Sequence, residues 1–177
     1  GAPAVKGNRE KTVAELVAPL EEAMGGKVVL DKNGRFYLRI PGQGNLEMPL
    51  VAEGLRKLAM VARLITTGSL LDKGYLFWDE PEANLNPKLI KLVALAAVTL
   101  SQQGIQVVIA THSYFLLKEI DLLTRQEAVA QRYFALVRGE GLVERIEVAD
   151  HLSGLEHLVS LDEELAQYDR EMELVNA

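Results

Sequence analysis

The chain has 177 residues, of which 49% are hydrophobic and 25% are charged, a composition ordinary for a globular protein with a sizeable core. The net charge of −6 argues against nucleic-acid binding as the dominant feature of this chain, although a local basic patch stays compatible with it. The absence of cysteine excludes disulfides and thiolate metal sites, and it agrees with a cytoplasmic location. No hydrophobic run is long enough to span a bilayer, so we expect no membrane partner.

The hydrophobic pattern along the chain predicts an α/β fold. Residues 1–9 show no period and are expected to be loose, and the capping-box pair Thr12 and Glu15 then marks a helix. The pair Asn33-Gly34 between alternating segments predicts an antiparallel hairpin near the N-terminus. The predicted elements are, in chain order, a helix from about 12 to 24, strands at 28–30, 36–40 and 46–51, a helix at 52–66, a strand at 75–79, a helix from 87 to about 103, a strand at 105–110, a helix at 114–122, strands at 133–138 and 142–148, and a helix at 160–175.

A strand–helix–strand unit is predicted between residues 75 and 110. The apolar run that ends at Trp78 reads as a strand buried on both faces, and Asn86 and Pro87 are typical of a helix start. Two such strands joined by one helix run parallel in the same sheet. We therefore expect a single α/β domain over residues 1–177, with a partly parallel sheet and flanking helices. Its segments are 1–9, 10–51, 52–125 and 126–177.

Two predicted strand ends carry polar residues suited to phosphate chemistry. Asp79 and Glu80 follow the first parallel strand, and Thr111-His112-Ser113 follow the second. Because parallel strands finish at the same edge of a sheet, these residues should approach each other. An Asp can hold Mg²⁺, an adjacent Glu can orient and deprotonate a water, and a His can donate to a phosphate oxygen. The pattern predicts half of a phosphoryl-transfer site.

The same residues resemble the motifs of ABC-type ATPases, in particular the bacterial group related to RecF, SMC proteins and the overcoming-lysogenization-defect nucleases. The run Asp79-Glu80-Pro81-Glu82-Ala83-Asn84-Leu85-Asn86-Pro87 is similar to their Walker B and D-loop segment, with Asn86 in place of the usual His. The strand that leads into Thr111-His112-Ser113 resembles their switch motif. Residues 52–58 resemble the signature motif, although Ala52 lacks its usual hydroxyl. The resemblance covers about residues 46–125.

The resemblance implies that ATP and Mg²⁺ are the ligands. Asp79 would hold Mg²⁺, Glu80 would activate water, and His112 would contact the γ-phosphate. Nucleotide would lie between two copies, with Gly54 and Arg56 or Lys57 of one signature segment facing the phosphate loop of the other. Asn86 would make a D-loop contact across that dimer, although a simple turn and cap role explains it equally well. The resemblance places such cassettes in DNA repair, phage defence and toxin-type systems, with DNA as a possible partner of the full-length protein.

One motif of these ATPases is missing. The pattern G-x-x-x-x-G-K-[ST] is absent, and the Gly26-Lys27 pair is followed by Val28. We therefore expect this chain to be the C-terminal part of a longer ATPase, which pairs with an N-terminal lobe of the same protein, or to be a degenerate relative. The competing hypothesis is a regulatory or dimerisation module that supplies only signature and D-loop contacts to a partner. A nuclease of the related group would need a further acidic domain, for which the residues after the last strand are too few.

Overall fold

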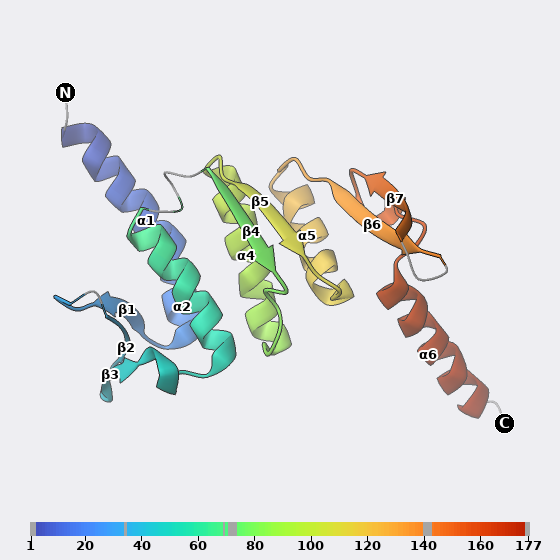
Figure 1. Cartoon of the computed structure of the whole chain (residues 1–177), viewed down its shortest axis with the longest axis horizontal. Helices are drawn as coiled ribbons and strands as arrows, with labels where there is room; N and C mark the ends of the chain where they lie inside the picture. The colour runs from blue at the N-terminus through green and yellow to red at the C-terminus, as the bar shows by residue number, and fades with distance from the viewer. Residues whose placement is uncertain (1–2, 34, 69, 71–73, 140–142, 176–177) are drawn as a thin grey trace. The chain divides into compact units, whose positions relative to one another are not determined.

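The computed structural model describes residues 3–33, 35–68, 70, 74–139 and 143–175, and its elements are labelled in Figure 1. The chain divides into two compact units, Gly1–Thr111 and His112–Ala177. The expectation of one domain over residues 1–177 stays a prediction. Every helix in the described part of the chain is too short or too polar to cross a lipid bilayer.

Helix α1 (Pro3–Met24) begins well before Thr12, where the capping-box pattern had placed its start. Proline suits the first turn of a helix, because no intrahelical partner is available there for a backbone N–H. Leu16, Leu20 and Met24 are buried, and α1 packs against helices α2 (Glu53–Thr66) and α4 (Pro87–Gln102). The segment expected to be loose is therefore helical from Pro3 onward.

A three-stranded antiparallel sheet follows α1. Its strands β1 (Lys27–Leu30), β2 (Phe36–Ile40) and β3 (Gly44–Glu47) pair in the order β1-β2-β3. The Asp31 carboxylate accepts from the backbone N–H groups of Asn33 and Arg35, each at 2.8 Å, which closes the turn between β1 and β2. Gly34, predicted to form this turn with Asn33, lies outside the described residues. The hairpin is confirmed, but the third strand ends at Glu47 and residues 48–50 form a 3₁₀ turn.

The predicted strand–helix–strand unit is confirmed. Strand β4 (Tyr75–Asp79) runs parallel to β5 (Gln106–Ala110), and α4 connects them. The side chain of Asn86 caps α4 by accepting from the backbone N–H of Leu89 at 3.1 Å. A partly parallel α/β fold with flanking helices and a hairpin near the N-terminus is thus the observed class.

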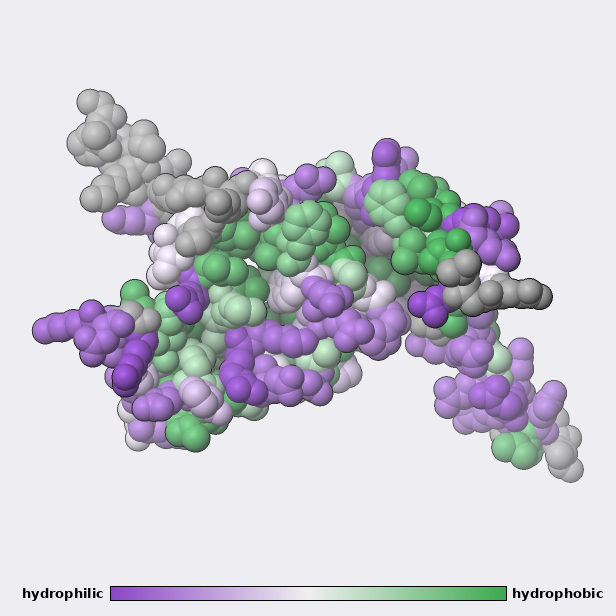
Figure 2. All heavy atoms as spheres, in the orientation of Figure 1, coloured by the Kyte–Doolittle hydropathy of each residue, from purple (hydrophilic) through white to green (hydrophobic). Residues whose placement is uncertain are grey.

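The apolar run of β4 had predicted a strand buried on both faces, but one face is exposed. Trp78 is 8% exposed, whereas Tyr75 and Phe77 are 53% and 73% exposed. Successive side chains of a strand point to opposite faces, and α4 packs against this two-stranded sheet through β5. Figure 2 shows hydrophobic atoms at the surface over these strands. Periodicity alone could not show that one face is uncovered.

The second unit combines two helices with an antiparallel hairpin. Its main elements are α5 (Tyr114–Gln126), β6 (Tyr133–Arg138), β7 (Val143–Ala149) and α6 (Val159–Val175). Ser113 caps α5 by accepting from the backbone N–H of Leu116 at 3.2 Å, and the helix runs four residues beyond its predicted end. The hairpin is confirmed as antiparallel, and residues 140–142 lie outside the described part.

A buried carboxylate organises this second unit. Asp121 on α5 is 1% exposed, pairs with Arg125 at 2.7 Å, and accepts from the backbone N–H of Leu152 at 3.1 Å. It therefore joins α5 to the 3₁₀ turn Leu152–Gly154. Burial, together with the nearby negative charge of Asp121, raises the pKa of Tyr133 well above its ordinary value.

Candidate active site

Asp79 and Glu80 are presented at the carboxyl end of the parallel strand pair. Asp79 is the last residue of β4 and lies opposite Ala110 of β5. The backbone N–H of Glu80 donates to the carbonyl oxygen of Ala110 at 2.8 Å, so the pairing extends one residue beyond the strand. Both carboxylate residues are exposed. This edge of an α/β sheet is the usual location of ligand sites.

The backbone of Glu80 adopts a conformation that non-glycine residues rarely take. Its φ is +41°, and its carbonyl oxygen accepts from the ammonium group of Lys57 at 2.7 Å and from the backbone N–H of Ala83 at 3.2 Å. Lys57 lies on α2, a different element from β4. Sequence reasoning had weighed this lysine for a phosphate or partner contact, whereas the structure places its ammonium group on the backbone of Glu80.

Gly54 brings the start of α2 against the loop that follows Glu80. It is buried in the first turn of α2, and a Cβ atom at this position would lie 2.4 Å from Leu85 Cδ2 and 2.7 Å from the Asn84 carbonyl oxygen. Only a glycine permits this close approach. Arg56 is exposed on the same helix. Asn86 is also exposed, at the end of the same loop, where its side chain serves as the cap of α4.

A second link joins the two strand ends. The Thr111 hydroxyl, one residue beyond β5, donates to Glu82 Oε1 at 2.5 Å. Glu82 is 7% exposed, and its Oε2 is buried without a hydrogen-bond partner among the described residues. The sequence places Thr111 in the switch segment expected to approach Asp79 and Glu80, but no local pattern indicates this bond to Glu82, 29 positions away.

His112 follows Thr111 directly and is the first residue of the second unit. Its side chain is exposed, and its approach to Asp79 and Glu80 stays a prediction. The carboxylate oxygens of Asp79 and Glu80 are the hard ligands that Mg²⁺ prefers, so this strand end fits a magnesium ion. Gly26-Lys27 does not fit the nucleotide phosphates. The backbone N–H of Gly26 already donates to the carbonyl oxygen of Glu21 in α1, and Lys27 is the first residue of β1.

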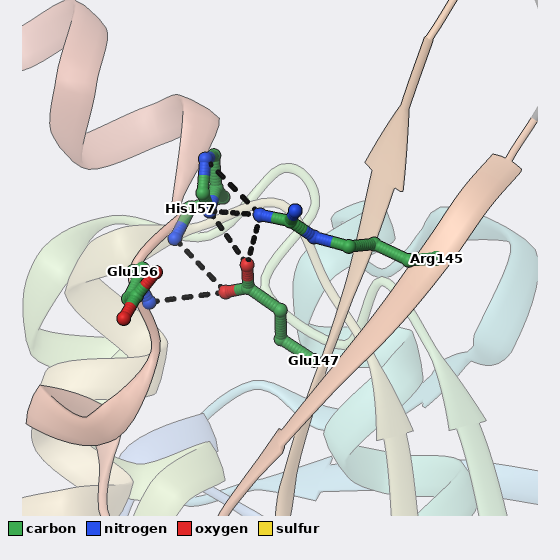
Figure 3. Close-up of polar contacts among 4 residues, drawn as sticks. All are labelled: Arg145, Glu147, Glu156 and His157. Atoms are coloured by element: carbon green, nitrogen blue, oxygen red, sulfur yellow. Dashed lines mark hydrogen bonds and ion pairs between the residues drawn. The ribbon is translucent and has the colours of Figure 1, made fainter.

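A further polar cluster lies in the second unit (Figure 3). Glu147 Oε1 contacts Arg145 Nη2 at 2.9 Å and His157 Nδ1 at 2.6 Å, and Oε2 accepts from the backbone N–H groups of Glu156 and His157 at 3.0 and 3.1 Å. The ligand atoms of Glu147, Glu156 and His157 lie within 4.8 Å of one another, a spacing compatible with a metal ion. Because the Arg145 cation already binds the central carboxylate, we interpret the cluster as an ion-pair network that holds the segment before α6 on β7.

This network predicts an acid-dependent loss of stability. Desolvation raises the pKa of Glu147, but the hydrogen bonds from Arg145 and from the His157 and Glu156 backbones outweigh it and hold the pKa at about 2. Because the folded-state pKa lies below the ordinary value of about 4.3, the stabilisation is complete above that value and is lost as pH falls toward 2. Unfolding midpoints of wild type and Glu147→Gln should therefore converge between pH 5 and pH 2. Glu144→Gln, an exposed change on the same strand, serves as the control, and a constant gap between wild type and Glu147→Gln would contradict the prediction.

Comparison with known proteins supports the sequence-based resemblance. The sequence profile of a family described as "AAA domain, putative AbiEii toxin, Type IV TA system" matches residues 6–118. No curated protein was found to match the sequence. Several solved structures share the fold, and three of them are head domains or ATPases of SMC proteins.

The first comes from work on ATP-driven dimerization and DNA-stimulated activation of SMC ATPases, with a TM-score of 0.59, 14% identity, and 91% of both chains covered. The second is an Smc head bound to the C-terminal winged-helix domain of ScpA, with a TM-score of 0.59, 13% identity, and 84% of this chain and 44% of that chain covered. The third is a Pyrococcus furiosus Smc head domain with an extended coiled coil, with a TM-score of 0.57, 14% identity, and 96% and 38% covered. The chain thus spans less than half of the last two structures, and at these identities the likeness shows the fold alone.

Proposed function

The chain belongs to this AAA-domain family, and on that premise we propose that it forms part of an ABC-type ATPase that binds ATP and hydrolyses it with Mg²⁺. The observation that carries the proposal is the placement of Asp79 and Glu80 at the carboxyl end of the parallel pair β4 and β5, with the Glu80 backbone bonded to Ala110 and Lys57. Two exposed carboxylate residues on a backbone held at this edge suit a metal-assisted attack of water on a phosphate.

Each residue of the site has a distinct role in the proposal. Asp79 would hold the magnesium ion, and Glu80 would orient the attacking water and accept its proton. His112 donates a hydrogen bond to the γ-phosphate. The magnesium ion, when bound, neutralises charge on the phosphate oxygens.

The remaining site residues act across a dimer of two such cassettes. Gly54 and Arg56 lie at the start of α2, where backbone N–H groups and a cation suit an anionic ligand of the facing copy. Asn86 contributes a contact from the D-loop. Support comes from the fold shared with SMC ATPases, one of which was studied for ATP-driven dimerization. The phosphate loop would come from an N-terminal lobe of the same ATPase.

A second candidate function rests on a specific observation. The 177 residues contain no phosphate loop, and the Gly26-Lys27 pair lies at a helix–strand junction. Without a phosphate loop of its own, the chain would act as a regulatory or dimerisation module that supplies signature and D-loop contacts to a partner. A DNA-related or phage-defence role is our proposal for the ATPase, and the DNA stimulation described for the SMC neighbour supports testing it.

The decisive experiment is ATP turnover by the full-length protein, with and without duplex DNA. Wild type should hydrolyse ATP only with Mg²⁺, and Asp79→Asn should lose roughly 100-fold or more in turnover, because several kcal/mol of charge stabilisation by the metal would be lost. Glu22→Gln, which removes an exposed carboxylate from α1, is the matched control and should retain turnover. Absence of turnover in the wild type, with or without DNA, would favour the module, and full activity of Asp79→Asn would remove that residue from the site.

A further inference from the structure

Glu80 is held by contacts that come from three separate segments. Its backbone N–H donates to the carbonyl oxygen of Ala110 on β5. Its carbonyl oxygen accepts from the ammonium group of Lys57 on α2 and from the backbone N–H of Ala83 in the loop that follows. The loop itself is tied to the end of β5 through the Thr111 hydroxyl and Glu82 Oε1, at 2.5 Å. Glu82 is two residues from Glu80, and Thr111 is adjacent to Ala110. The side-chain bond therefore closes a ring around the Glu80 turn.

Stability alone does not account for the Glu82–Thr111 pair. Burying a carboxyl group is costly, and Glu82 Oε2 has no hydrogen-bond partner among the described residues to offset that cost. Replacing a buried polar pair with apolar groups of similar shape is often neutral for stability. What the pair does provide is geometry, because it is a directional link between the loop and the strand that flank Glu80. Glu80 needs such a constraint, since its φ of +41° is unfavourable for a residue with a Cβ atom.

We propose that Glu82 is a positioning residue, which acts through Thr111 to hold Glu80 in its left-handed conformation at the end of β4. The expected consequence is correct placement of the Glu80 carboxylate toward the attacking water, and this consequence rests on the proposed ATPase function. Misplacement of a catalytic group affects the chemical step more than the binding of substrate. Glu80, Glu82 and Thr111 all lie in the first unit.

The test uses the full-length protein and removes the hydroxyl donor of Thr111 while keeping the shape of the side chain. Thr111→Val deletes the hydroxyl, Thr111→Ser keeps it, and Thr99→Val removes a hydroxyl of similar exposure that bonds within α4. We expect Thr111→Val to lower kcat by roughly tenfold or more while KM for ATP changes little, because an acceptor near the catalytic turn loses its partner. Thr111→Ser and Thr99→Val should stay close to wild type. Glu82→Ala should reproduce the loss, and its effect should not add to that of Thr111→Val.

Hydrogen exchange provides a second readout that does not depend on activity. In Thr111→Val, the backbone amides of Glu80 and of residues 82–85 should exchange faster than in wild type, while those of α4 should be unchanged. Unchanged exchange in this loop would overturn the positioning role, as would a fall in stability with kcat intact. If the wild type fails to hydrolyse ATP, the proposed function fails, but the exchange comparison still decides whether Glu82 and Thr111 hold the turn.

Discussion

Glu80→Gln is expected to abolish ATP turnover in the full-length protein while ATP binding is preserved. The amide of Gln can still bond to a water but cannot accept its proton, so the loss should be about 10²- to 10⁴-fold in kcat. Because bound ATP would persist, the variant should also accumulate as a nucleotide-bound dimer. Turnover, nucleotide affinity and molecular mass in solution measure these three effects separately.

The matched control for Glu80→Gln is Glu22→Gln, which makes the same chemical change at an exposed position on α1. It should keep both wild-type turnover and the wild-type response to ATP. Near-normal turnover in Glu80→Gln would remove Glu80 from its assigned role. Loss of ATP binding together with turnover would instead show that the residue supports the binding site rather than the chemical step.

Gly54→Ala is expected to destabilise the first unit, although alanine is the better helix former. The helix gains about 1 kcal/mol from the replacement. The new Cβ atom, however, would lie 2.7 Å from the backbone oxygen of Asn84 and 2.4 Å from Leu85 Cδ2. Overpacking of this kind costs about 1–3 kcal/mol, and the backbone oxygen cannot rotate away. The contact with a backbone atom places this cost in the upper part of that range, about 2–3 kcal/mol. After the helix gain is subtracted, the net loss should be about 1–2 kcal/mol in the free energy of unfolding, measured by denaturant titration.

Two further variants make the Gly54 prediction specific. Arg56→Ala changes an exposed side chain on the same helix and should alter the free energy of unfolding by less than about 0.5 kcal/mol. In a Leu85→Ala background, Gly54→Ala should lower the free energy of unfolding by less than in wild type, because the contact with Leu85 is gone. A smaller loss should remain, because the contact with the Asn84 carbonyl oxygen is still present. A stabilised Gly54→Ala protein would show that the loop moves aside freely and that α2 does not constrain it.

Local signals predicted the start and type of most elements correctly. Asn86-Pro87 at the start of α4 is an example, because a helix cap depends on residues within one turn of each other. The ends and extents were less accurate. Helix α1 begins at Pro3 and α5 continues to Gln126, beyond the limits that caps and apolar spacing indicated. Such boundaries depend on how each helix packs as well as on its own residues.

The exposure of the β4 face could not be read from its apolar run. An uninterrupted hydrophobic segment is typical of a strand covered on both faces, yet Tyr75 and Phe77 lie largely exposed. The difference depends on which elements cover the sheet, and this is a property of the assembled fold.

The sequence by itself determined the α/β class, the parallel pairing of β4 with β5, and the location of Asp79 and Glu80 at a strand end. These features follow from periodicity and from the single helix that connects the two strands, because such a crossover is typical of parallel pairing. Only the tertiary structure decided what surrounds Glu80. Lys57 lies 23 positions away from Glu80, and Thr111 lies 29 positions from Glu82, so neither contact has a local signature. Side chains at such separations meet because helices and strands pack together, and the contacts that hold the Glu80 turn therefore become visible only in the folded chain.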